Sequence, residues 1–98
     1  MYNIDFDPEF QEELNDIRGS NPDGHDVIIR KIRDIAEVLE WSPNHHKNLR
    51  YPLNKFKRVH LNEHFVLVFR VNKWTKTVEF FAYDHHDNIY NNKKLLGF

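Results

Sequence analysis

The hydrophobic pattern changes its period near Pro43, and this change limits the possible folds more than any other feature of the sequence. Before Pro43, apolar residues recur every three or four positions, as they do on one face of a helix. After it, they alternate with polar residues in short runs, as in half-buried strands. Helices followed by hairpin-connected strands predict an α+β fold in which the helices pack on an antiparallel sheet.

The part of the chain before Pro43 contains one short predicted strand, followed by two predicted helices. Residues 2–6 alternate as a strand does, and Asp7-Pro8 then has the form of a helix N-cap followed by proline at the first helical position. A Gly-Ser-Asn-Pro sequence ends this first helix and can start the next one. The second helix carries a long apolar stripe over residues 27–39, and we predict that Trp41, at its end, belongs to the core.

Three β-rich runs follow, over residues 56–61, 65–71 and 77–83. Connections of three and five residues separate them, and both are short enough for hairpins. The predicted order of elements is therefore β-α-α-β-β-β, within a single domain that spans residues 1–98.

Composition restricts both the chemistry and the compartment. The chain has 98 residues and no cysteine, which excludes disulfides, thiolate metal sites and a cysteine nucleophile. No apolar run reaches the roughly 20 residues that a membrane helix needs, and the first residues lack a signal-peptide pattern. We therefore expect a cytoplasmic protein without a membrane partner.

Charge is divided unevenly along the chain. Residues 1–40 contain eleven Asp and Glu against four Lys and Arg, whereas residues 41–98 contain four against ten. Six of the seven histidines also lie in the second part. A basic, histidine-rich region favours a polyanionic partner such as RNA, because Lys and Arg release condensed counterions when they contact phosphates.

Four segments of this second part resemble the RelE/ParE superfamily. In order, they are Leu49-Arg50-Tyr51-Pro52-Leu53, Phe56 to Asn62, His64 to Val71, and Tyr83-Asp84-His85-His86-Asp87-Asn88-Ile89-Tyr90. The last segment is similar to the ending of archaeal and bacterial RelE-like toxins. The match extends over nearly the whole chain and includes both predicted helices.

The resemblance implies a toxin of a type II toxin–antitoxin pair. Such toxins commonly cleave mRNA, on the ribosome or free, need no metal or other cofactor, and are silenced when an antitoxin wraps around them. Relatives called ParE share the fold but poison DNA gyrase without cutting RNA. Because one fold serves both activities, a non-catalytic protein-binding toxin, or one that has lost its activity, stays an open alternative, as does a plain RNA-binding domain.

Strand alternation predicts which side chains of the 56–61 run can act together. Arg58 and His60 share one face, whereas Val59 and Leu61 share the other and should meet the helices. The resemblance places Arg58 and His60 where RelE-type toxins carry phosphate-binding and catalytic lysines. We therefore predict Arg58 as a phosphate clamp and His60 as a proton-transfer group.

The last resembling segment supplies the other predicted catalytic residues. The resemblance implies an acid–base role for His85 or His86, and it places Tyr90 beside the phosphate or stacked on a base. Neighbours on a strand point to opposite faces, so we expect only one of the two histidines to face the same cleft as His60. The same alternation argues against a zinc site made from the Asp-His-His-Asp run, and no metal site is predicted.

One departure from the family concerns an arginine early in its third strand, at the position that we align with Val66. Here the arginine of that run is Arg70, which alternation places on the same face but roughly 13 Å further along the strand. Arg70 is kept among the predicted substrate-binding residues. Three further cations are predicted to contact the RNA backbone: Arg50, Lys55 and Lys57.

Overall fold

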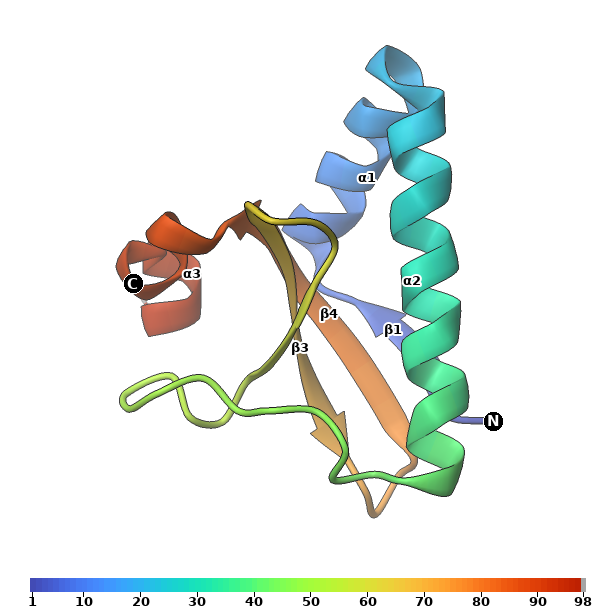
Figure 1. Ribbon diagram of the computed structural model, residues 1–98, viewed down its shortest axis with the longest axis vertical. Coiled ribbons are helices and arrows are strands. Elements are labelled where there is room, and N and C mark those ends of the chain that lie inside the picture. The colour runs from blue at the N-terminus through green and yellow to red at the C-terminus, as the bar shows by residue number, and fades with distance from the viewer. Residues whose placement is uncertain (98) are drawn as a thin grey trace.

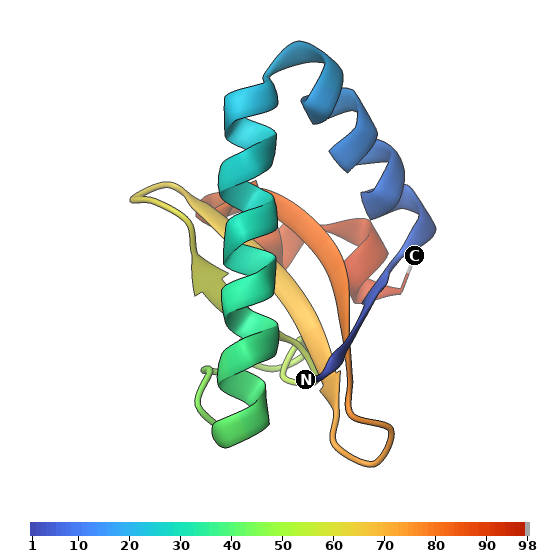
Figure 2. The same cartoon turned by 90° about the vertical axis from the view of Figure 1, so that its right-hand side faces the viewer.

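Two long helices cover one face of a four-stranded sheet, and a short C-terminal segment covers the other (Figures 1 and 2). The computed structural model describes residues 1–97. The elements follow in the order β1 (Asn3–Phe6), α1 (Pro8–Ser20), α2 (Pro22–Trp41), β2 (Lys57–His60), β3 (Phe65–Asn72), β4 (Thr77–His85), the 3₁₀ helix η1 (His86–Asn91) and α3 (Lys93–Leu96).

The sheet has the strand order β1-β4-β3-β2. β2, β3 and β4 form the expected antiparallel meander, whereas β1 runs parallel to β4. The predicted α+β fold with two helices packed on a sheet is confirmed, and the sheet is mixed rather than wholly antiparallel. Two parallel strands need a long connection between them. Here the segment that connects β1 to β4 contains both helices and the strands β2 and β3.

Both helices begin at side-chain caps. The Asp7 carboxylate accepts a hydrogen bond from the Phe10 N–H at 3.1 Å, and the Asn21 side chain accepts one from the Gly24 N–H at 3.1 Å. A proline occupies the first position of each helix, where its missing N–H leaves no bond unmade. The caps and prolines predicted these starts correctly.

The main core lies between the helices and the sheet. α2 contributes one apolar face, and the strands contribute every second residue. Each large side chain buried here stabilises the fold by about 1.5–3 kcal/mol. The buried members are Tyr2, Phe10, Leu14, Ile28, Ile32, Ile35, Ala36, Leu39, Leu67, Phe69, Val78 and Phe80.

The prediction that Trp41 belongs to this core is wrong. Its side chain is 84% exposed at the last residue of α2. Figure 1 shows this end of α2 beside the hairpin turn between β3 and β4.

A second apolar cluster covers the opposite face of the sheet. It joins the 49–56 loop and the C-terminal segment to β3 and β4. Its buried members are Leu49, Leu53, Phe56, Val66, Val68, Ala82, Ile89 and Leu95. The sheet face that carries Arg58 and His60 is therefore partly covered by the 49–56 loop and the C-terminal segment. These two segments shape the surface beside β2.

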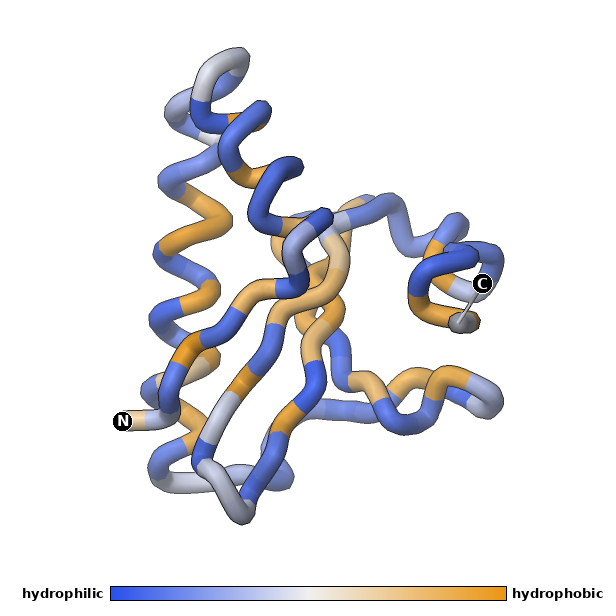
Figure 3. The backbone as a smooth tube through the Cα atoms, turned by 180° about the vertical axis from the view of Figure 1, so that it is seen from behind, coloured by the Kyte–Doolittle hydropathy of each residue, from blue (hydrophilic) through white to orange (hydrophobic). Residues whose placement is uncertain are grey.

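None of the helices within residues 1–97 is both long and apolar enough to cross a bilayer. Figure 3 shows the reason, since hydrophilic residues recur between hydrophobic ones along each helix.

Candidate functional site

A cleft of about 510 Å³ opens beside β2, between the 48–50 loop, the β2–β3 turn and η1. Five of the side chains named from the sequence line it: Arg50, Arg58, His60, His86 and Tyr90. The structure thus brings together residues that lie up to 40 positions apart. Below, "the cleft" denotes this space.

The register of β2 explains why two of these side chains face the cleft. Arg58 pairs with Val68 and His60 with Val66, both on the side of the second apolar cluster. Val59 and Leu61 pack against the main core on the other side, as alternation predicts. Burial of one face of β2 therefore fixes which side chains the other face presents.

Tyr90 is held against the 48–50 loop by Arg50. Its hydroxyl oxygen accepts a hydrogen bond from the Arg50 N–H at 2.8 Å, and the Arg50 Nε lies 3.4 Å from the same oxygen. Burial raises the pKa of the phenol, but the two hydrogen bonds from Arg50, with the charges of Arg50 and Arg58, outweigh it and hold the pKa below its usual value. Because the oxygen accepts these bonds, its own proton stays available to another acceptor in the cleft.

Of the two adjacent histidines, His86 lines the cleft and His85 does not. Their rings nevertheless do not point to opposite faces, since they stack with centroids 4.6 Å apart. The expected alternation fails because β4 ends at His85 and the backbone turns into η1 at His86.

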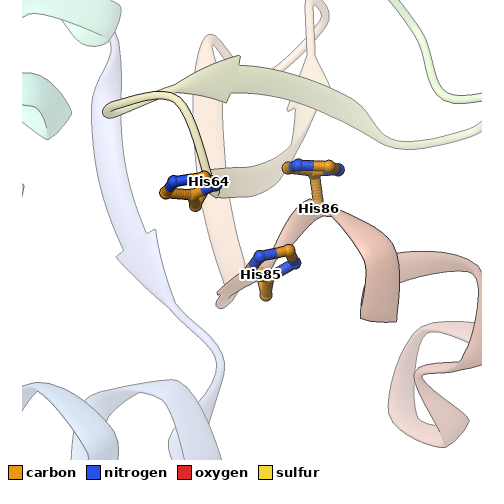
Figure 4. A group of neighbouring side chains, drawn as sticks. All are labelled: His64, His85 and His86. Carbon is orange, nitrogen blue, oxygen red and sulfur yellow. The ribbon is translucent and has the colours of Figure 1, made fainter.

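A third histidine joins this pair. Figure 4 shows His64, His85 and His86 side by side, and one ring nitrogen from each lies within 4.8 Å of the others. Below, "the histidine cluster" denotes these three residues. His64 was not among the predicted site residues, because its approach to His85 and His86 depends on the pairing of Phe65 with His85 and on the turn of the chain from β4 into η1.

Three predicted cations lie outside the cleft: Lys55, Lys57 and Arg70. The Lys57 Nζ donates to the His46 carbonyl at 3.1 Å and to Asn48 Oδ1 at 2.9 Å, on the far side of β2. Burial, and then the charge of Lys73, lower the pKa of Lys57. Lys55 lies over the Phe56 ring, with Nζ 5.3 Å from the ring centroid.

Arg70 also lies away from the cleft. It pairs with Glu79 at 3.4 Å and covers the Phe81 ring near the other end of β3. Val66 does line the cleft and is fully buried. Within residues 1–97, β3 therefore contributes no cation to the cleft, and Arg70 does not stand in for one.

Two carboxylates that were not among the predicted site residues also line the cleft. Glu63 lies in the β2–β3 turn and Asp87 follows His86. Each is next to a histidine in sequence and close to a strand end, which is a signal that could have identified them. Asp87 Oδ1 lies 2.9 Å from His86 Nδ1, so this carboxylate can orient the imidazole.

The side chains that line the cleft can transfer protons and can bind an anion such as a phosphate group. Imidazoles exchange protons near neutral pH, guanidinium groups bind phosphate in a forked geometry, and a phenol can donate to a phosphate oxygen. These groups come from three separate segments of the chain, so a substrate that spans the cleft can contact all of them.

Comparison with known proteins shows which family the chain belongs to. No family model matches the chain. "Putative toxin RelE4" of Methanocaldococcus jannaschii is 44% identical over 96 residues, which cover 98% of each protein. An uncharacterised protein of Methanosarcina mazei is 36% identical over 90 residues, which cover 92% of this chain and 100% of that protein.

Solved structures share the fold at lower identity. A metal-bound toxin from Helicobacter pylori superposes with a TM-score of 0.70 at 19% identity, over 91% of this chain and 99% of that one. A chain of the YoeB–YefM complex from Staphylococcus aureus gives 0.64 at 16% identity, over 88% and 98%. A chain of the RelBE2 toxin–antitoxin complex from Mycobacterium tuberculosis gives 0.56 at 20% identity, over 87% and 98%. With close similarity to RelE4 over its full length, the chain belongs to the RelE-like toxins of the RelE/ParE superfamily.

Proposed function

We propose that this toxin is an endoribonuclease that cleaves mRNA without a metal ion, acting in the cytoplasm on ribosome-bound or free transcripts. The observation that carries the proposal is the meeting of Arg58, His60, His86 and Tyr90 in one cleft. Two imidazoles can supply the base and the acid that attack by the 2′-hydroxyl requires, and a guanidinium and a phenol can stabilise the charge on the phosphate.

In the proposed reaction, the 2′-hydroxyl of the RNA attacks the adjacent phosphorus. One of His60 and His86 accepts the 2′-hydroxyl proton, and the other donates a proton to the leaving 5′-oxygen. The bond from phosphorus to the 2′-oxygen forms and the bond to the 5′-oxygen breaks, which gives a 2′,3′-cyclic phosphate and a free 5′-hydroxyl. Arg58 and Arg50 would balance the phosphate charge, and the Tyr90 hydroxyl would donate to a phosphate oxygen.

An antitoxin partner follows from the family and from charge. The two complexes named above contain a toxin of this fold with its antitoxin. In this chain, Arg50 and Arg58 give the cleft a cationic wall that acidic side chains of a partner would match. We expect a neighbouring gene to encode a short protein that co-purifies with this chain, and separate elution of the two would contradict the pairing.

The decisive experiment adds the purified chain to translating ribosomes with a defined mRNA and maps the new 5′ ends. Cuts phased with codons support cleavage on the ribosome, and cuts in the mRNA alone support ribosome-independent cleavage. Intact mRNA in both reactions would contradict the nuclease proposal.

A non-catalytic toxin is the second candidate, and the buried Val66 favours it. Without an arginine at that place, the cleft has one cation fewer for stabilising the transition state. If the mRNA stays intact while the chain binds and inhibits DNA gyrase, the ParE-like function is the correct one.

A further inference from the structure

We propose that the histidine cluster, His64, His85 and His86, binds one divalent transition-metal ion such as Zn²⁺, Ni²⁺ or Cu²⁺. The three rings offer one nitrogen each within 4.8 Å of the other two. Imidazole is a preferred ligand for these ions, whereas Mg²⁺ and Ca²⁺ prefer oxygen donors. The donor set therefore selects the class of metal.

Backbone contacts hold the three residues together. The Asn62 side chain accepts hydrogen bonds from the N–H groups of His64 and Phe65, at 2.8 and 2.9 Å, and so fixes the β2–β3 turn. The His86 N–H donates to the His64 carbonyl at 2.8 Å, and Phe65 pairs with His85 in the sheet. The ligands thus come from two segments that are already joined, and a metal ion would not have to gather them from a disordered state.

Side-chain rotations would have to complete the geometry, because the lone pairs of stacked imidazole rings do not point at a common ion. The rings are stacked, with centroids 5.6 Å apart for His64 and His85 and 6.4 Å apart for His64 and His86. In a tetrahedral zinc site, ligand nitrogens about 2.0–2.1 Å from the ion lie about 3.3 Å from one another. The nitrogens must therefore move closer to one another by about 1.5 Å at most. The side chains of His64 and His86 are exposed and can rotate to bring their nitrogens together.

Asp87 would act as the carboxylate that orients the ligands. Its Oδ1 lies 2.9 Å from His86 Nδ1, and its Oδ2 lies 3.6 Å from His85 Nδ1. A metal-bound histidine usually donates its other N–H to such a carboxylate. With Nδ1–H of His86 donated to Asp87, the Nε2 lone pair is left for the ion.

His85 needs one rearrangement. Its Nδ1 accepts a hydrogen bond from the Asp87 backbone N–H at 3.1 Å, so in the neutral ring the proton is on Nε2. Binding through Nε2 moves that proton to Nδ1, where Asp87 Oδ2 can accept it. No proton is lost from the ring in this step, and the hydrogen bond to the backbone N–H is exchanged for one to the carboxylate.

The site bears on activity because His86 belongs to both the histidine cluster and the cleft. This second part of the inference rests on the proposed nuclease function. An ion bound to His86 would remove its lone pair from proton transfer, so we expect the metal to inhibit cleavage. His64 lies outside the set that lines the cleft, which allows the two roles to be separated by substitution.

The test uses the full chain without an oligohistidine tag. ZnCl₂ and NiCl₂ are titrated into the wild type, His64→Ala and His45→Ala, with binding measured by calorimetry and MgCl₂ as the negative titrant. We expect one ion per chain, at least about tenfold weaker binding by His64→Ala, and unchanged binding by His45→Ala, an exposed histidine elsewhere. Circular dichroism confirms that each variant is folded, and His64→Gln repeats the test with a side chain of similar size.

Two results would overturn the site: no stoichiometric binding by the wild type, or equal affinity of the wild type and both His64 variants. RNA cleavage is measured in parallel with and without Zn²⁺. Inhibition of the wild type but not of His64→Ala supports the link to the cleft. Metal binding without any RNA cleavage would reject the nuclease function but support the metal site. RNA cleavage without metal binding would reject the metal site but support the nuclease function.

Discussion

The Tyr90 hydroxyl lies 2.8 Å from the backbone nitrogen of Arg50, and the Arg50 guanidinium carbon lies 4.7 Å from the centroid of the same ring. One side chain thus closes the cleft by joining η1 to a loop 40 residues earlier. The contact combines a hydrogen bond with a cation–π interaction, so it fixes the position of the guanidinium as well as the loop.

Replacing Tyr90 by Phe should reduce RNA cleavage by about 10²–10³-fold, because the hydroxyl would no longer donate to the phosphate. Stability should fall by only about 0.5–1 kcal/mol, since water can reach the exposed Arg50 N–H. Cleavage rates and thermal unfolding separate the two effects. Tyr51→Phe is the matched control, because Tyr51 is 86% exposed in the neighbouring loop. Equal activity of both variants would contradict the role given to Tyr90.

His60→Ala and His86→Ala should each lower cleavage by about 10²–10⁴-fold and relieve growth arrest on induction. Both side chains are exposed, so their removal should leave the thermal midpoint almost unchanged. His45→Ala removes an exposed histidine outside the cleft and should stay fully active. Full toxicity of both cleft variants would show that the catalytic groups lie elsewhere.

Arg58→Gln and Arg70→Gln compare two arginines on adjacent strands. We expect Arg58→Gln to reduce cleavage by about 10²-fold or more, because its charge stabilises the phosphate in the transition state. Arg70→Gln should change cleavage less than about twofold, and breaking its exposed pair with Glu79 should lower stability by at most about 1 kcal/mol. Single-turnover cleavage under the same conditions measures both. A larger loss with Arg70→Gln would mean that RNA extends along β3.

The acid dependence of stability should depend on His46. Burial of the ring lowers its pKa, and the positive charges of His45, Lys57 and Lys31 lower it further. Its folded pKa is therefore below the unfolded value of about 6.5, so its contribution to stability is complete above that pH and is lost as pH falls through the folded value. Thermal unfolding at pH 7.5 and pH 5 should show a smaller drop for His46→Phe than for the wild type.

A control for this slope is His25→Gln, which removes a histidine on α2 without touching the His46 ring. This variant should keep the acid slope of the wild type. Within residues 1–97 the His46 Nδ1 is buried without a hydrogen-bond partner, so phenylalanine should also preserve or raise stability at pH 7.5. Identical slopes for the wild type and His46→Phe would reject this assignment.

Asp7 joins the two ends of the described chain. Its carboxylate caps α1 through the Phe10 N–H and also accepts from Lys94 Nζ at 3.1 Å. Asp7→Ala should cost about 1–2 kcal/mol through the lost cap, with an added contribution from the half-buried ion pair. Asp7→Asn keeps a capping oxygen and should cost less than half as much. Denaturant unfolding ranks the variants, and equal losses would assign the whole effect to the ion pair.

Local rules predicted the parts of the fold that local interactions decide. The caps at Asp7 and Asn21 set the helix starts, and alternation in β2 placed Arg58 and His60 opposite the helices. The order of elements followed from the change of period. Each of these depends on neighbours in sequence, which a single chain displays.

The rest depends on contacts between distant segments. The second apolar cluster joins Leu49 and Leu53 to Ile89 and Leu95, and no periodicity links those positions. Alternation failed for the two adjacent histidines because β4 ends between them, and strand ends are set by pairing partners. Trp41 was misplaced for a similar reason, since its exposure depends on which distant segments pack beside the last turn of α2.

The residues that line the two sides of the cleft are synthesised at different times. Arg50, Arg58 and His60 are synthesised before the strands β3 and β4, whereas His86 and Tyr90 come after them. A nascent chain that has emerged only as far as β4 therefore carries one wall of the cleft and lacks the other. If the proposed activity is correct, the ribosome that makes this toxin meets no finished cleft until η1 has folded back onto the 48–50 loop.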